Sequence, residues 1–232
     1  MDRPLLDPMT RSRATRSTLP FEELISSIPG LDPGLWSAIS AFGKGRKSTR
    51  VLFTGTQPGD GVTVAATAAA LGLARHLRVT TAYVETDLER PAVKGYLGMP
   101  STAGLSDLLD GESSFDEAVS DVPGCPDLIV LGAGRARRAI PGEFASDIAE
   151  GILGRIVSPS QFTILDGPPI ASHPQMLSLL RHVDAAVLVV RARTSMKSEL
   201  ARAKAVLDQA RVPVIGSVLN RFKPDHPWVN PA

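Results

Sequence analysis

A glycine-rich turn lies where a predicted strand, residues 50–54, meets a predicted helix over residues 62–76. In such a turn the backbone N–H groups can converge on an anion, and the N-terminus of the helix adds its dipole. Gly59 and Gly61 permit torsions and a close approach that a Cβ atom would block. Thr63, in the first helical turn, is placed to hold Mg²⁺. The segment therefore predicts the binding of phosphate oxygens.

Two residues of this turn depart from the phosphate-binding pattern G-x-x-x-x-G-K-[ST]. Val62 stands at the lysine position, and Thr56 stands at the position of the first glycine. The lysine of that pattern neutralises charge on the β- and γ-phosphates during transfer. Backbone amides can still hold phosphates without it, so the turn predicts binding with little catalysis. Taken alone, the string also fits an ordinary Gly/Pro turn before a helix.

Polar side chains follow three other predicted strands. Asp87 lies just beyond one strand, Asp166 ends another, and Asn220 with Arg221 ends the last. Ionised carboxylates at buried strand ends need a partner, which is often a metal or a base. An asparagine at such a position can bind the edge of a purine. Each of these residues, considered alone, could equally be a turn or capping residue.

Short aliphatic runs alternate with helical segments from about residue 50 onward. The runs are apolar throughout, which is typical of strands buried on both faces. This order predicts an α/β fold, with a mostly parallel sheet, helices on both faces, and ligands at the carboxyl ends of the strands. The predicted strands are 50–54, 79–85, 127–131, 162–166, 185–191 and 214–220. The predicted helices are 62–76, 144–156, 174–180 and 195–209.

Composition narrows the class of protein. The 232 residues include 25 Lys and Arg and 24 Asp and Glu, a formal net charge of +1, so no nucleic-acid partner is expected. The single cysteine, Cys125, excludes an internal disulfide framework, and we expect it in a loop without chemistry. The lack of a secretory signal or an apolar run of ~20 residues predicts a cytoplasmic protein, whose membrane association would come through a partner.

The motifs, taken in order, resemble the bacterial tyrosine kinases of capsule and exopolysaccharide biosynthesis. These are P-loop ATPases related to the cell-division and plasmid-partition ATPases. The resemblance covers about residues 48–222 and rests on TGTQPGDGVT (54–63), VETDLERP (84–91), GLSDLLDG (104–111), ILDGPP (164–169), VDAAVLVVR (183–191) and GSVLNR (216–221). It implies a P-loop NTPase fold, and we expect a kinase-like domain over 45–222, a flexible arm with short helices over 1–44, and a tail over 223–232.

The resemblance also implies roles for individual residues. Its nucleotide would be ATP or ADP with Mg²⁺, and Asp87 and Asp166 would be the catalytic carboxylates. The implied metal site is Thr63, Asp87 and Asp166. The implied phosphate-binding amides are those of Gly59, Asp60, Gly61, Val62 and Thr63. Asn220 and Arg221 would lie near adenine, and the partner would be the cytoplasmic part of a membrane chain-length regulator, with a homo-oligomer as a further expectation.

Several departures from the family pattern predict a degenerate, kinase-like protein. Besides Val62, the chain has Glu85 and Glu89 where the family usually has Asp and Arg. Residues 222–232 contain no tyrosine, and residues 21–42 contain no arginine of the kind that drives ring assembly. Two alternatives stay open. The chain could be an active kinase or ATPase that uses a substitute lysine, Lys94 or Lys197, or it could be a structural adaptor without nucleotide.

Overall fold

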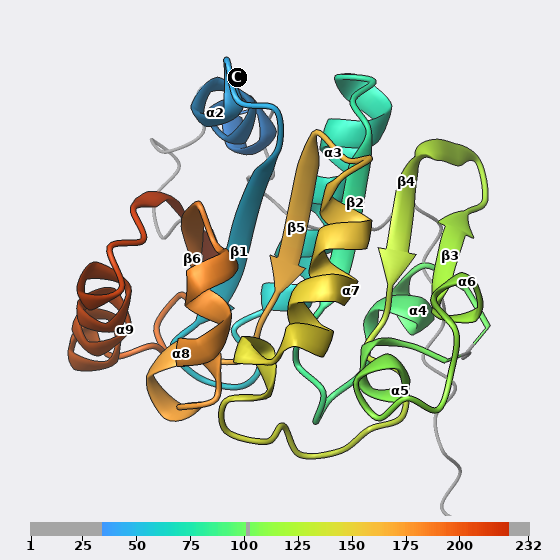
Figure 1. The fold of residues 1–232 in the computed structure, drawn as a ribbon. Coiled ribbons are helices and arrows are strands. Elements are labelled where there is room, and N and C mark those ends of the chain that lie inside the picture. Colours follow the sequence, from blue (N-terminus) through green and yellow to red (C-terminus); the bar gives the residue numbers. More distant parts are fainter. Residues whose placement is uncertain (1–33, 101–102, 223–232) are drawn as a thin grey trace, which may run out of the picture.

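A seven-stranded sheet runs through the part of the chain that this computed structural model describes, residues 34–100 and 103–222. Its strand order is β3-β4-β2-β5-β1-β6-β7, and all neighbouring strands are parallel except β3 and β4 (Figure 1). The strands are β1 (Thr49–Gly55), β2 (Thr81–Glu85), β3 (Val119–Val122), β4 (Cys125–Leu131), β5 (Phe162–Asp166), β6 (Ala185–Arg191) and β7 (Val214–Asn220).

Among the described residues, one helix precedes the first strand, and the other helices lie between strands. The helices are α2 (Gly34–Gly43), α3 (Val62–His76), α4 (Val93–Tyr96), α5 (Leu105–Leu109), α6 (Phe115–Ala118), α7 (Asp147–Val157), α8 (Met176–Leu179) and α9 (Lys197–Gln209). Three short 3₁₀ turns complete the set: η1 (Glu143–Ala145), η2 (Ile170–Ser172) and η3 (Leu180–His182). None of the helices in the described ranges is long and apolar enough to cross a membrane.

The sheet is covered on both faces, as Figure 1 shows with α3 behind it and α7 and α8 in front. Successive residues of a strand point to opposite faces, so each buried strand supplies two cores. In β1, Val51 and Phe53 join the core with α2 and α3, whereas Leu52 joins the core with α7 and α8. Two covered faces require strands that are apolar throughout. The predicted α/β class with a mostly parallel sheet is therefore confirmed.

Helix α3 is held tightly on the sheet, and this fixes the position of the loop before it. Its residues 65–74 are all buried and are mostly alanine, whose small side chain lets the helix lie close to the strands. Gly72 admits the ring of Trp36 from α2, because a Cβ atom on Gly72 would come within 2.4 Å of that ring. Trp36 also stacks on His76 at the end of α3, with ring centroids 5.5 Å apart. The loop of residues 56–61 is thus anchored by β1 on one side and by α3 on the other.

Several features differ from the sequence-based expectations, two of them in the strands. Strand β3, which is only four residues long, was not predicted and adds an antiparallel edge beside β4. Cys125 is not a loop residue: it is the first residue of β4 and is buried. One of the short helices expected within residues 1–44 is present as α2. The expectations for residues 1–33 and 223–232 lie outside the described residues.

Candidate functional site

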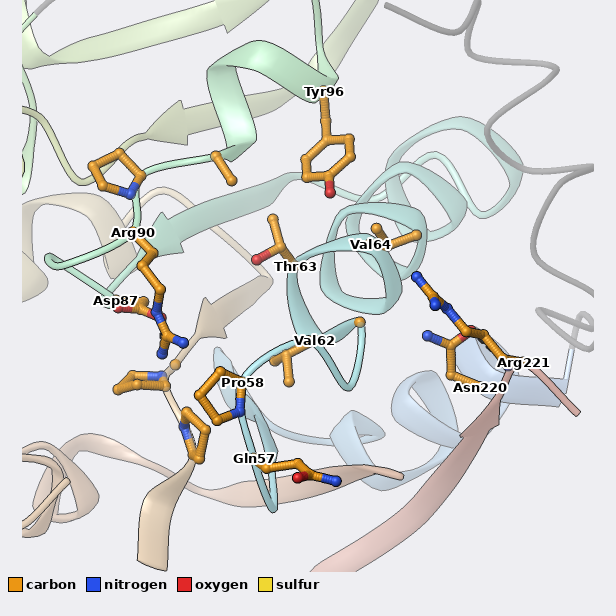
Figure 2. Close-up of a pocket in the computed structure, with 17 residues that line it drawn as sticks. Gln57, Pro58, Val62, Thr63, Val64, Asp87, Arg90, Tyr96, Asn220 and Arg221 are labelled. Atoms are coloured by element: carbon orange, nitrogen blue, oxygen red, sulfur yellow. Dashed lines mark hydrogen bonds and ion pairs between the residues drawn. The ribbon is translucent and has the colours of Figure 1, made fainter. Parts of the chain in front are cut away.

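A pocket of about 660 Å³ lies at the carboxyl ends of the parallel strands (Figure 2). This volume is in the range that small-molecule ligands occupy. Most residues predicted for the site line it, namely Gly59, Gly61, Val62, Thr63, Asp87, Asn220 and Arg221. Asp60 and Asp166 do not line it, and both are buried. The structure thus brings together residues from loops that follow β1, β2 and β7.

The backbone of the glycine-rich loop presents its amides to this pocket. Gly59 and Gly61 adopt φ values of +89° and +95°, a region that residues with a side chain rarely enter. The first backbone bond of α3 that involves the loop runs from the Ala65 N–H to the Gly61 carbonyl, at 3.0 Å. Within the described ranges, the amides of Gly59, Gly61, Val62 and Thr63 donate to no protein acceptor. Four unpaired N–H groups at the start of a 15-residue helix form a cradle suited to an anion.

The buried side chain of Asp60 holds the glycine-rich loop in shape. Its Oδ2 accepts hydrogen bonds from the Thr56 amide (2.8 Å), the Thr56 hydroxyl (2.9 Å) and the Gln57 amide (3.1 Å). Its Oδ1 accepts one from the Ser195 hydroxyl, at 3.1 Å, beyond the end of β6. Sequence reasoning considered only the amide of Asp60. The carboxylate fixes the first half of the loop and ties it to a neighbouring strand.

Asn220 is attached to the same loop. Its Nδ2 donates to the Asp60 carbonyl at 2.7 Å, so the end of β7 is joined directly to the loop backbone. A Cβ atom on Gly61 would lie only 2.0 Å from that Nδ2, so only glycine fits at this position. The adenine contact expected of Asn220 and Arg221 stays a prediction. Figure 2 shows both side chains on the far side of the loop from Asp87.

Asp87 faces the pocket together with an arginine that the family resemblance did not single out. Arg90 Nη2 lies 2.8 Å from Asp87 Oδ2, and both residues line the pocket. Asp87 Oδ1 is buried and has no hydrogen-bond partner among the described residues. A buried, unpaired carboxylate oxygen beside a phosphate-type loop fits a metal ligand. The spacing of three residues between Asp87 and Arg90 was the available signal for this pair.

Asp166 is 1% exposed and does not line the pocket. Burial raises its pKa to about 7, and the charges of Glu85 and Asp87 raise it too. Hydrogen bonds from the hydroxyls of Tyr83 and Thr63 act in the opposite direction. The Tyr83 hydroxyl donates to Asp166 Oδ2 at 2.6 Å. Asp166 can therefore hold or release a proton near neutral pH, beside the threonine predicted to bind Mg²⁺.

Glu85, which stands where the family usually has Asp, does not line the pocket and is bound to backbone amides. Its Oε1 accepts from the amides of Ala92 (2.6 Å) and Val93 (3.0 Å), and its Oε2 accepts from the amide of Ala133 (2.9 Å). Burial raises the pKa of Glu85, and these backbone donors oppose that rise. Both carboxylate oxygens are thus engaged with backbone. Glu85 joins the end of β2 to the start of α4 and to the loop after β4.

Neither candidate for a substitute lysine lines the pocket. Lys94 Nζ donates to the Ala103 carbonyl at 2.9 Å, and burial lowers the pKa of this ammonium. Lys197, the first residue of α9, is also absent from the pocket lining. Arg90 does line the pocket, and its side chain is 41% exposed.

The protein residues at the pocket could supply only part of the coordination of Mg²⁺, so nucleotide phosphates and water would supply the rest. Within the described ranges no group of three or more His, Cys, Asp or Glu side chains could hold a metal by itself. Mg²⁺ usually takes only one or two carboxylates and completes its shell with waters and substrate phosphates. Thr63 and Asp87, both in the pocket lining, could supply such a minimal set.

Comparison with known proteins supports the resemblance to bacterial tyrosine kinases. No protein-family model matches the chain. The putative tyrosine-protein kinase CapB of Staphylococcus aureus is 25% identical over 224 residues, which are 97% of this chain and 89% of CapB. The kinase domain of the Escherichia coli tyrosine kinase ETK superposes with a TM-score of 0.76 at 19% identity, covering 93% of this chain and 88% of that domain. The chain resembles bacterial tyrosine kinases.

The kinase likeness extends to a wider group of P-loop ATPases. The septum site-determining protein MinD of Pyrococcus horikoshii, solved as a complex with Mg-ADP, superposes with a TM-score of 0.60 at 20% identity. That match covers 75% of this chain and 70% of MinD. Together with the sheet order and the loop after β1, these similarities confirm the predicted P-loop NTPase fold.

Proposed function

We propose that this kinase-like chain binds Mg-ATP or Mg-ADP in the pocket and transfers phosphoryl groups very slowly. In this proposal it regulates the cytoplasmic part of a membrane chain-length regulator in capsule or exopolysaccharide biosynthesis. The observation that carries the proposal is the cradle: four unpaired amides remain around residues 59–63, although Val62 removes the ammonium group.

The cradle would bind the phosphates through its backbone amides. The amides of Gly59, Gly61, Val62 and Thr63 would donate to phosphate oxygens, and the dipole of α3 would add to their attraction. When bound, Mg²⁺ supplies positive charge to the phosphate oxygens. Thr63 and Asp87 would hold it, with Asp166 behind them keeping or releasing a proton.

Catalysis suffers from the replacement more than binding does. The P-loop lysine stabilises charge that develops on the phosphates in the transition state. Loss of one preorganised donor of this kind costs about 2.7–4 kcal/mol, or roughly 10²–10³ in rate. The backbone amides stabilise the bound phosphates independently of residue 62, so affinity is retained to a larger degree than rate.

A titration combined with a turnover assay tests this function. Mg-ATP and Mg-ADP are titrated into the full chain by calorimetry, and phosphate release and autophosphorylation are followed in the same preparation. Binding with turnover near background is the expected result. Turnover at the rate of an ordinary kinase would favour the active enzyme, and failure of both nucleotides to bind would favour the adaptor. A pull-down with the cytoplasmic segments of a chain-length regulator tests the partner.

A further inference from the structure

Arg90 brings the positive charge that Val62 lacks into the same pocket. We propose that Arg90 acts as an exchangeable substitute cation: phosphate oxygens draw its guanidinium away from Asp87, and Asp87 is then released to bind Mg²⁺. This inference rests on the proposed nucleotide site. It assigns to the pocket a coupling in which the nucleotide and the metal each strengthen the binding of the other.

The position of Arg90 supports the exchange. Figure 2 shows its side chain reaching past Asp87 toward Pro58 and Val62 of the loop. Arg90 lines the pocket, its side chain is 41% exposed, and Nη2 is bound to Asp87 Oδ2 at 2.8 Å. An ion pair that is partly open to solvent is weak and costs little to break. A phosphate offers the planar fork of an arginine two parallel hydrogen bonds and a larger negative charge.

Asp87 has the geometry of a metal ligand that is occupied by an ion pair until nucleotide binds. Its side chain is 15% exposed, Arg90 binds Oδ2, and Oδ1 is buried without a partner in the described part of the chain. While Arg90 is paired, a cation that approaches Asp87 meets a competing positive charge. Movement of Arg90 to a phosphate frees Oδ2 and leaves the carboxylate with no internal counter-ion. Metal affinity is then higher in the presence of nucleotide, and the reciprocal effect follows by linkage.

The other cations near the loop are less suited to this exchange. Arg221 lies with Asn220 on the far side of the loop from Asp87 in Figure 2. Arg191 approaches the loop at Gly59, where its Nη1 is 4.0 Å from the place that a Cβ atom would take. Lys94 donates to the Ala103 carbonyl. Only Arg90, among these, is paired in the structure with a predicted metal ligand.

The test separates nucleotide affinity from metal affinity by calorimetry. Metal-free ADP in EDTA, and Mn²⁺ alone as the metal probe, are titrated into the wild-type chain and into R90Q, D87N and R138Q. Arg138 is 94% exposed, lies outside the pocket and pairs loosely with Glu89, so R138Q removes the same charge without touching the site. Circular dichroism checks the folding of each variant, and R90K serves as a second variant that keeps the charge but loses the fork.

R90Q and D87N are expected to have opposite effects on the affinities for metal-free ADP and for the metal. R90Q should weaken metal-free ADP binding about 10- to 100-fold, because a charge-assisted, bidentate contact is lost, and should tighten Mn²⁺ binding several-fold. D87N should bind metal-free ADP at least as tightly as the wild type and lose the Mg²⁺ dependence of nucleotide binding. R90K should be intermediate, and R138Q should match the wild type.

The outcomes also distinguish failure of the Arg90 exchange from failure of the proposed nucleotide-binding function. If the wild type binds ADP and R90Q binds both ADP and Mn²⁺ with unchanged affinity, the exchange is wrong and the nucleotide site stands. If R90Q weakens ADP and Mn²⁺ binding together, Arg90 does not compete with the metal, and the exchange is again wrong. If the wild type binds no nucleotide, the proposed function fails and the inference fails with it.

Discussion

Replacement of Asp60 by alanine tests whether the loop is preorganised by its own side chain. The carboxylate accepts four hydrogen bonds, from the Thr56 amide and hydroxyl, the Gln57 amide and the Ser195 hydroxyl. The two hydroxyls can rotate toward other acceptors, but the two amides cannot. A buried donor left without an acceptor costs about 1–3 kcal/mol, so two amides predict a loss of about 3 kcal/mol in the free energy of unfolding.

Urea unfolding followed by circular dichroism measures this loss. D116A is the matched control, because Asp116 is a surface aspartate whose side chain is 94% exposed, and its replacement should change stability by less than about 0.5 kcal/mol. The m values of both variants should equal that of the wild type, which shows that the unfolded states are comparable. If D60A and D116A have the same stability, Asp60 does not hold the loop, and the reasoning about preorganisation is refuted.

Three further substitutions examine the loop and the carboxylate below it. Val62→Lys should tighten Mg-ATP binding in calorimetry by restoring an ammonium group at the phosphates, and an unchanged affinity would show that the loop does not hold them. Gly61→Ala should destabilise the fold by about 2 kcal/mol, because a side chain at φ +95° collides with Asn220, whereas Gly151→Ala, at a helical site with open space, should not destabilise it. For Asp166 the raised pKa means that the folded protein keeps a proton which the unfolded chain has released between about pH 4 and pH 7, so this residue lowers stability as pH rises through that window. Asp166→Asn should remove this dependence, so the free energy of unfolding of the variant should rise relative to that of the wild type by about 2 kcal/mol between pH 5 and pH 8. If the two proteins have parallel profiles of stability against pH, the assignment is contradicted.

The elements that carry strong local patterns could be predicted from the sequence. Helix α3 begins and ends at the predicted residues, since a glycine turn precedes it and its alanine-rich sequence favours a helix throughout. Strands β5, β6 and β7 also match their predicted bounds. The apolar runs of β5 and β6 are buried along most of their length, whereas the residues of β7, at the edge of the sheet, are only half-buried or exposed.

Weaker local signals produced the errors. Strand β3 has only four residues and exists because β4 lies beside it, so no window of its own sequence identifies it. The predicted helix 144–156 is split in the structure. A 3₁₀ turn, η1, comes first, and Ser146 then caps α7 by accepting a hydrogen bond from the Ala149 amide at 3.2 Å. Helix propensity alone does not distinguish one continuous helix from a 3₁₀ turn followed by a separately capped helix.

The positions of the site residues could be predicted, but most of their contacts could not. Parallel strands bring their carboxyl ends to one edge, which explains why Asp87 and Asn220 meet the same pocket. The bond between Tyr83 and Asp166 joins residues 83 positions apart, and that between Asn220 and Asp60 spans 160 positions. Such pairs depend on strand register, which is settled only when the whole sheet has formed.

The central claim, that the amides around residues 59–63 bind phosphate without a lysine, can be observed directly by NMR. Unlabelled ADP and Mg²⁺ are titrated into ¹⁵N-labelled protein, and the amide resonances of Gly59, Gly61, Val62 and Thr63 are followed. The account predicts that these four signals shift together and saturate with one affinity, whereas the amides of Thr56 and Gln57, already bonded to Asp60, move little. Four unmoved signals at saturating nucleotide, or shifts confined to other regions of the protein, would contradict it.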